Sequence, residues 1–417
     1  MAAGRLLALR SERSIGPLAL LLLGINGVVG VGIFFAPSEL ALAAGRRGSV
    51  LVLLAVAIGL VPVAATFAIL GRRFDVDGGP VTFARAAFGE PVGFIVGWLS
   101  YASALFSTSA VLSGLATAIA SERTAGPLSI GLALGLSAVV ALGIHVSKRA
   151  WSAVTVLKLV PLVALALLAL VKAPRSLMPE VAAPTATDLG RAALSACFAF
   201  QGFEIVPVVS GQAHAPGRAV PLAVFGSLVF PAALYAVLQW SFVATVPDLH
   251  EGAPLVQVAS NLGGTGFGDL LRLGTSVSAL GIAFGMVVTT PRYLAAAVNA
   301  GRFARMSPRG VPLAALGVTS AALVVLLALA SLGQLFALAS LAVVVQYGVV
   351  ACALARLAFE RKVGLARAHI VPATLTLVTV ALLLSAPTRE EWLVFAVAAG
   401  SGALLYWWRI HAPASRN

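Results

Sequence analysis

Apolar stretches of about 20 residues follow one another along nearly the whole chain, separated by short polar connections. A stretch of this length crosses the hydrocarbon core of a bilayer as an α-helix, which satisfies its own backbone hydrogen bonds where no water is present. Only 10% of the 417 residues are charged, against about 25% in a typical soluble domain. We therefore predict an all-α polytopic membrane protein, with one transmembrane domain covering residues 1–417.

Hydropathy divides this domain into about twelve spans. The expected limits are 16–44, 49–71, 91–120, 127–145, 150–172, 188–211, 219–246, 270–299, 311–331, 334–356, 367–386 and 390–409. The two longest polar connections are expected to be plain loops, at 173–187 and at 247–269. The basic start of the chain, followed by a long apolar stretch with many further spans behind it, favours an uncleaved first helix.

The net charge of +13 is explained by basic residues that lie between the apolar stretches. With the N-terminus inside, 19 of the 28 lysines and arginines lie on the inner side and 8 on the outer side. This bias places both termini in the cytoplasm and the protein in the plasma (inner) membrane. No basic patch interleaved with aromatic residues points to nucleic acid. Cys197 and Cys352 fall inside apolar stretches, as buried structural thiols do, and the histidines show no metal-ligand spacing.

The first span contains an unusual run of glycines, in the segment LLLGINGVVGVGIFFAP at 21–37. Each glycine weakens a helix interior by about 1 kcal/mol relative to alanine. Gly27 follows Gly16 by 11 residues, a helical rise of about 16 Å, which reaches the middle of the bilayer. Asn26 lies just before the weak point, so the first helix is expected to be interrupted near the membrane centre.

The sixth span carries a second weak point, where Gln201, Gly202, Glu204 and Pro207 fall within seven positions. Proline removes a helical hydrogen bond, and on its own such a segment could be an ordinary kink. The first and sixth spans, however, are five spans apart, as the first members of two five-helix halves would be. Paired interruptions in corresponding positions of two halves indicate the binding site of a transporter.

Each interruption exposes one kind of backbone group. The N–H groups after the first break, at Gly30, Val31, Gly32 and Ile33, would begin a half-helix and suit a carboxylate. The carbonyl groups at Phe198, Ala199 and Gln201 would end a half-helix and suit an ammonium group. Together the two ends describe a site for a zwitterion such as an α-amino acid.

Two ionisable residues lie deep in expected spans, where a functional role is the default hypothesis. Lys158 is a candidate proton carrier or a fixed cation in place of Na⁺, and the alternative is a lysine that extends to the inner surface. Glu204 is a candidate proton acceptor or gate, and the alternative is a carboxylate held by the N–H groups of the first break. Glu39, nearer the outer end of the first span, could simply face a vestibule.

Several segments together resemble the amino acid–polyamine–organocation (APC) transporters. They are GVGIFFAP at 30–37, GGPVTFARAAFGEPVGFIVGWLSY at 78–101, KLVPL at 158–162, FAFQGFEIVPVVSGQAHAPGRAVP at 198–221 and TTPRYLAAAVNAGRFARMSP at 289–308. The resemblance implies a LeuT-type fold of five-plus-five inverted repeats, with one repeat at about 16–172, the second at about 188–356 and two extra helices at about 367–410. It also implies amino-acid transport by alternating access, with Lys158 in a site that Na⁺ occupies in other relatives and Glu204 at a position where glutamate is common.

Two positions depart from the family pattern. Val31 stands where a serine or threonine is usual, and Gln201 stands where an apolar residue is more usual. A polar or non-standard amine substrate therefore remains open beside the common amino acids. The pocket for the substrate side chain is expected to include residues from several spans, namely Ser103, Ser107, Phe203, Phe284 and Gln346.

The leading hypothesis is a Na⁺-independent, proton-coupled amino-acid symporter, and the runner-up is an exchanger of amino acids or amines. An intramembrane enzyme would need paired aspartates, a metal site or a Ser–His pair within the spans, and a channel would need rings of polar groups. Neither pattern occurs in the sequence, so we expect no catalytic residues, no metal and no cofactor other than the coupling proton. The expected partners are the amino acid and the lipid bilayer, while the oligomeric state is not readable.

Overall fold

A computed structural model describes residues 15–30, 32–74, 76–120, 122–143, 148–175, 183–249, 254–298, 303 and 305–411. Nearly all of these residues are helical, and the elements follow in the order α1 Pro17–Val28, α2 Gly32–Arg73, α3 Pro80–Phe88, α4 Glu90–Ile119, α5 Glu122–Ala141, α6 Lys148–Lys172, α7 Ala186–Phe200, η1 Phe203–Gln212, α8 Pro216–Thr245, α9 Pro254–Gly263, α10 Thr265–Val298, α12 Leu313–Leu329, α13 Leu332–Phe359, η2 Lys362–Gly364, η3 Arg367–His369, α14 Ile370–Leu384 and α15 Arg389–His411.

Eight segments of the described chain are long and apolar enough to cross a membrane, and three shorter apolar helices accompany them. The prediction of an all-α polytopic membrane protein is confirmed. The five-plus-five inverted repeat and its boundaries stay a prediction.

The expected boundary between the first two spans, at residues 45–48, is present as a sharp kink and not as a loop. α2 consists of two helical segments that meet at Gly45, whose backbone is not helical and whose φ of 72° is in the left-handed region. A glycine adopts this conformation without steric cost. The chain can therefore change direction there without a longer loop, at the position where hydropathy ends the first expected span and begins the second.

The expected plain loop at 247–269 was wrong in part, because it contains α9 and the start of α10. Pro254 begins α9, a position that suits proline because the first N–H of a helix needs no intrahelical partner. Leu255, Val258 and Ala259 are buried on one side of this helix. Their spacing of three and four residues is that of an amphipathic helix.

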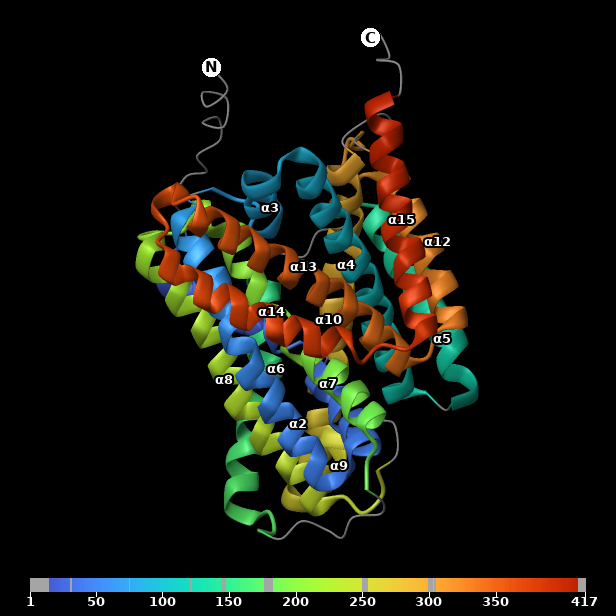
Figure 1. Ribbon diagram of the computed structural model, residues 1–417. Coiled ribbons are helices and arrows are strands. Elements are labelled where there is room, and N and C mark those ends of the chain that lie inside the picture. The colour runs from blue at the N-terminus through green and yellow to red at the C-terminus, as the bar shows by residue number, and fades with distance from the viewer. Residues whose placement is uncertain are drawn as a thin grey trace.

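The helices pack so that segments distant in sequence lie side by side. α2 packs against α7 and α8, α4 packs against α10 and α13, and α1 packs against α8. Figure 1 shows α3 at one end of the molecule and α9 at the other, with α14 crossing α2 and α15 lying along α4. We refer to these two ends as the α3 end and the α9 end.

Candidate functional site

The first helix is interrupted where the glycines predicted it. α1 ends at Val28, the Val29 N–H donates to the Ile25 carbonyl at 2.8 Å, and α2 begins at Gly32. The Tyr235 hydroxyl of α8 donates to the Val28 carbonyl at 2.8 Å. This bond gives the last carbonyl of α1 a buried partner in place of the missing helical N–H.

The sixth span is interrupted at Gln201 and Gly202, between α7 and η1. Gly202 has a φ of 130°, which side chains rarely tolerate. The following element, η1, is a 3₁₀ segment of ten residues that is kinked at Val209. Runs of 3₁₀-helix longer than three or four residues are uncommon and often mark a functional hinge or strain. The sequence predicted the break, but it did not predict this helix type.

The two interruptions touch each other through glycines. A Cβ on Gly202 would lie 2.3 Å from the Gly27 carbonyl carbon, and a Cβ on Gly32 would lie 2.9 Å from the Ala199 Cα. Real Cβ atoms essentially never approach other atoms below 3.0 Å. Glycine at these positions therefore permits the backbones of α1, α2 and the α7–η1 junction to cross in direct contact.

A cavity of about 670 Å³ lies beside this crossing. It is bordered by both breaks, by α4 and α10, and by part of α13. Arg85 and Glu90 also line it, pair with each other and are 43% and 50% exposed, so the cavity reaches the surface near the α3 end. Beside the α7 break, the Phe198 ring lines the cavity and stacks on the Phe336 ring with centroids 4.4 Å apart. The structure is thus open toward the α3 end.

Glu204 is the ionisable residue that lines the deep part of the cavity, away from the Arg85–Glu90 pair at its mouth. One of its oxygens, Oε2, accepts from the Gly202 N–H at 2.9 Å and from the Tyr347 hydroxyl at 3.2 Å. The two bonds fix the carboxyl group to the break and to α13. A carboxyl group held in this way, in contact with the cavity, can exchange a proton or meet a cationic group.

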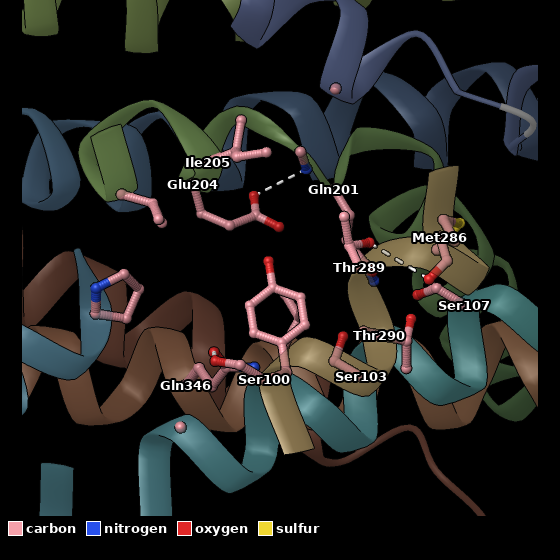
Figure 2. A pocket seen from close by; sticks show the side chains of 18 of the residues that line it. Ser100, Ser103, Ser107, Gln201, Glu204, Ile205, Met286, Thr289, Thr290 and Gln346 are labelled. Carbon is pink, nitrogen blue, oxygen red and sulfur yellow. Dashed lines mark hydrogen bonds between the residues drawn. The ribbon is translucent and has the colours of Figure 1, made fainter. Parts of the chain in front are cut away.

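The wall opposite Glu204 is rich in hydroxyl groups. Figure 2 shows Ser100, Ser103 and Gln346 across the cavity from Glu204, and Ser107, Thr289 and Thr290 gathered together. The Ser100 hydroxyl donates to the Gln346 side-chain oxygen at 2.9 Å, which joins α4 to α13. This wall can offer hydrogen bonds to a polar part of a bound molecule.

Most of the predicted site residues come together in this cavity. Those that line it are Asn26, Gly30, Gly32, Phe198, Ala199, Gln201, Glu204, Ser103, Ser107 and Gln346. The Gln201 amide reaches past the break and donates to the Ser340 hydroxyl at 3.1 Å. Val31 and the side chain of Lys158 lie outside the described residues, although α6 contains the Lys158 backbone.

Three predicted residues do not line the cavity. Ile33 and Phe203 are buried in the core, where the Phe203 ring packs against the rings of Phe67 and Tyr347. Phe284 packs against the same core from α10. For Ile33 and Phe203, the irregular backbone of each break changes the direction of the side chain that follows, so the helical spacing of the sequence does not carry across the break.

Two backbone groups also differ from the expectation. The Gly30 N–H donates to the Val28 carbonyl at 2.6 Å, and the Phe198 carbonyl accepts from the Gln201 N–H at 3.2 Å. The N–H groups of the first turn of α2 have no intrahelical acceptors, as in any α-helix, and their role in binding a carboxylate stays a prediction.

The sequence analysis missed a second polar strip on α10, formed by Thr289, Thr290 and Tyr293, as well as Ser100 on α4. Ser100 could have been found, because it precedes Ser103 by three residues and Ser107 by seven and so shares their helix face. The strip on α10 offered the same signal, because Tyr293 follows Thr290 by three residues and Thr289 by four.

No group of three or more histidines, cysteines, aspartates or glutamates in the described residues could hold a metal ion.

The model of the family described as "Amino acid permease" matches residues 15–404. Branched-chain amino acid permease BcaP of Bacillus subtilis (strain 168) is 27% identical over 260 residues, which are 57% of this chain and 56% of the permease. Serine/threonine exchanger SteT of the same organism is 26% identical over 302 residues, 67% of each chain. Human cationic amino acid transporter 4 is 26% identical over 386 residues, 84% of this chain and 60% of the transporter. With the family model matched over nearly its whole length, this integral membrane protein belongs to the amino acid permease family.

Proposed function

We propose that the protein is a secondary active transporter that moves an amino acid across the membrane by alternating access, as a Na⁺-independent, proton-coupled symporter. The observation that carries the proposal is the contact between the two helix interruptions at the edge of one cavity. Irregular backbone at membrane depth is tolerated where it lines a cavity, and transporters place their substrates at such breaks.

The substrate would bind between the two breaks. The first-turn N–H groups of α2 and the positive end of its dipole would meet the carboxylate, close to Gly30 and Gly32. The end of α7, close to Phe198 and Ala199, would meet the ammonium group. The hydroxyl-rich wall of α4 and α10 would contact the substrate side chain, which favours a neutral substrate with some polar character.

Proton coupling would use Glu204 and Lys158. Glu204 lines the cavity beside the break that ends α7. Lys158 would serve as a fixed or titrating cation on α6, in the role that a bound Na⁺ has in other relatives. In this proposal both termini are cytoplasmic, the protein resides in the plasma (inner) membrane, and it is a transporter with no enzymatic activity.

Exchange is the second candidate, because one similar protein is described as a serine/threonine exchanger. An exchanger would bind the same substrates at the same breaks but would return to its other state only when loaded.

Proteoliposomes separate the two candidates. Amino acids are first screened by the thermal stability of the purified protein, since a ligand that binds the folded state raises it. Uptake of a stabilising amino acid is then measured with and without an inward proton gradient, and with and without internal substrate. A symporter accumulates substrate in empty vesicles and loses accumulation when the gradient is collapsed. Uptake that does not depend on the proton gradient and requires internal substrate would overturn the symport proposal.

Lys158→Ala tests the role of the α6 cation. We expect the variant to lose proton-driven accumulation, because neither a proton carrier nor a fixed positive charge remains at that position. The measurement is accumulation under an imposed proton gradient, compared with binding in the thermal screen. Accumulation at the wild-type level would refute the role.

A further inference from the structure

A group of basic side chains gathers where α13 meets α14, beside the end of α2. The basic patch consists of Arg72, Arg73, Arg356, Arg361, Lys362 and Arg367, all of them exposed. Of the acidic residues that the structure describes, Glu360 lies among these basic side chains. Figure 1 places the connection between α13 and α14 toward the α3 end of the molecule.

Contacts join these residues into one surface. The Arg73 Nη1 lies 3.0 Å from the position of a Cβ on Gly364, so the end of α2 touches the connection after α13. Glu360 pairs with Arg356 at 3.1 Å and with Lys362 at 2.7 Å. These hydrogen bonds, the one from Lys362 foremost, lower the pKa of Glu360, so its carboxylate is ionised at neutral pH.

Among the described residues, the charge of the patch is therefore only partly balanced. Within that part of the chain one carboxylate stands against six basic groups, and its two ion pairs are on the surface, where such pairs contribute little to stability. An anion with more than one acceptor oxygen, such as a phosphate, would meet several hydrogen-bond donors within one small area. Arginine is well suited to phosphate because its planar guanidinium can donate two parallel hydrogen bonds.

Exposed apolar side chains border the same charges. Phe359 is 65% exposed at the end of the membrane-spanning helix α13, and Val363 is 42% exposed in the connection. The guanidinium of Arg367 lies 5.6 Å from the centre of the Phe359 ring. Leu365 is buried and anchors the connection to the core. A surface with apolar groups beside basic groups at the end of a membrane span matches the boundary between acyl chains and headgroups.

The backbone of the connection is held in an uncommon shape. Arg361 and Val363 have φ values of 52° and 56°. Left-handed conformations are rare for residues other than glycine and are outliers for β-branched ones such as valine. Such conformations persist where surrounding structure imposes them, and they concentrate at ligand sites and switch regions.

We propose that the basic patch binds the phosphate headgroup of an anionic phospholipid. The headgroup would lie between the end of α2 and the connection from α13 to α14, with Phe359 and Val363 at the acyl border. Because α2 starts at the first break and α13 carries Gln346 in the cavity wall, a bound lipid links two helices that border the substrate cavity. The proposal does not depend on which substrate is carried or on proton coupling.

Lipid retention by the full-length protein tests this proposal. The purified protein is placed in nanodiscs of phosphatidylcholine alone or of phosphatidylcholine with phosphatidylglycerol, extracted gently, and analysed by native mass spectrometry and by titration with each lipid. We expect phosphatidylglycerol to be retained and phosphatidylcholine to be washed out. Addition of inorganic phosphate to the phosphatidylcholine sample distinguishes a site for free phosphate, and saturable binding of phosphate alone would overturn the lipid proposal.

Two variants with opposite expected effects on lipid binding test the patch directly. The triple variant Arg361→Gln, Lys362→Gln, Arg367→Gln removes three charges and is expected to bind phosphatidylglycerol roughly 100-fold more weakly. Glu360→Gln removes the competing carboxylate, frees two basic side chains and is expected to bind it more tightly. Because Glu360 is on the surface, this second variant keeps the test valid even if the triple variant folds poorly.

The matched control replaces three exposed arginines outside the patch, Arg175→Gln, Arg272→Gln and Arg389→Gln. This control changes the net charge equally and is expected to retain phosphatidylglycerol as the wild type does. Equal loss in the control and in the patch variant would show a general charge effect and overturn the site. Unchanged affinity in Glu360→Gln would do the same.

Discussion

Gly202 is the residue through which the two interrupted helices meet, so Gly202→Ala perturbs the proposed substrate site most directly. Its φ of 130° is unfavourable for any residue with a Cβ, and the added methyl group would lie 2.3 Å from the Gly27 carbonyl carbon and 2.5 Å from the Gly27 oxygen. Ordinary contacts begin at 3.4 Å. The two backbones must therefore separate by about 1 Å or more, with little freedom to do so because both contacting groups are main chain.

The free-energy cost of Gly202→Ala has two parts. A positive φ costs a residue with a side chain about 1–2 kcal/mol, and overpacking a well-filled site costs about 1–3 kcal/mol. The sum, about 2–5 kcal/mol, lowers the equilibrium constant between the arrangement with the breaks in contact and a separated arrangement by at least roughly 30-fold. Since apparent affinity falls with the population of the competent state, substrate binding should weaken, by up to the same factor.

The assay is the substrate-induced rise in thermal stability together with initial uptake into proteoliposomes. Gly135→Ala serves as the control, because nothing lies within 4 Å of a Cβ at that position in α5. Alanine there should leave uptake unchanged and stabilise the helix by up to about 1 kcal/mol. Wild-type binding and uptake in Gly202→Ala would refute the view that direct backbone contact between the breaks builds the site.

Two further substitutions test single contacts. Tyr347→Phe removes the hydroxyl that donates to Glu204 at 3.2 Å but keeps the ring; we expect a loss of about 0.5–1.5 kcal/mol in stability and a shifted pH profile of uptake, and an unchanged profile would argue against Glu204 as the proton site. Arg46→Gln removes a buried guanidinium that donates to three carbonyls at the end of α8, so the unfolding midpoint should fall by the equivalent of about 3 kcal/mol. Arg47→Gln, which changes the exposed neighbouring arginine, should lower the unfolding midpoint much less. Equal decreases in the two variants would contradict the role of the Arg46 hydrogen bonds.

Hydropathy and glycine content were enough to predict the membrane-spanning helices and both interruptions. Transfer to lipid requires long apolar helices, and glycine or proline at membrane depth weakens them wherever they occur. The kink of α2 at Gly45 was also predicted in position, because Arg46 and Arg47 interrupt the apolar sequence there, but the tight glycine turn in place of a loop was not. The helix α9 was missed because its buried side chains are few and lie between polar segments.

The cavity was predicted in outline but not in its facing side chains. Ser103, Ser107 and Gln346 lie on regular helices, where spacing defines a face, and they line the cavity. Ile33 and Phe203 follow the breaks, where the irregular backbone determines which face of the next helix is turned toward the cavity. Both side chains are buried in the core. The bond from the Gly30 N–H to the Val28 carbonyl likewise depends on the exact turn, which the sequence does not define.

The central claim is that the amino acid binds in the cavity beside the two breaks. Its most direct test uses Ser107→Cys in a protein whose Cys197 and Cys352 are replaced by alanine, and measures the rate of modification by a soluble maleimide. Because Ser107 lines the cavity, which is open toward the α3 end, we predict that the cysteine reacts and that a stabilising amino acid slows the reaction in a saturable manner. A control cysteine at exposed Ala366 should react at the same rate with and without the amino acid. Full reactivity of the Ser107→Cys thiol at saturating amino acid would contradict the claim.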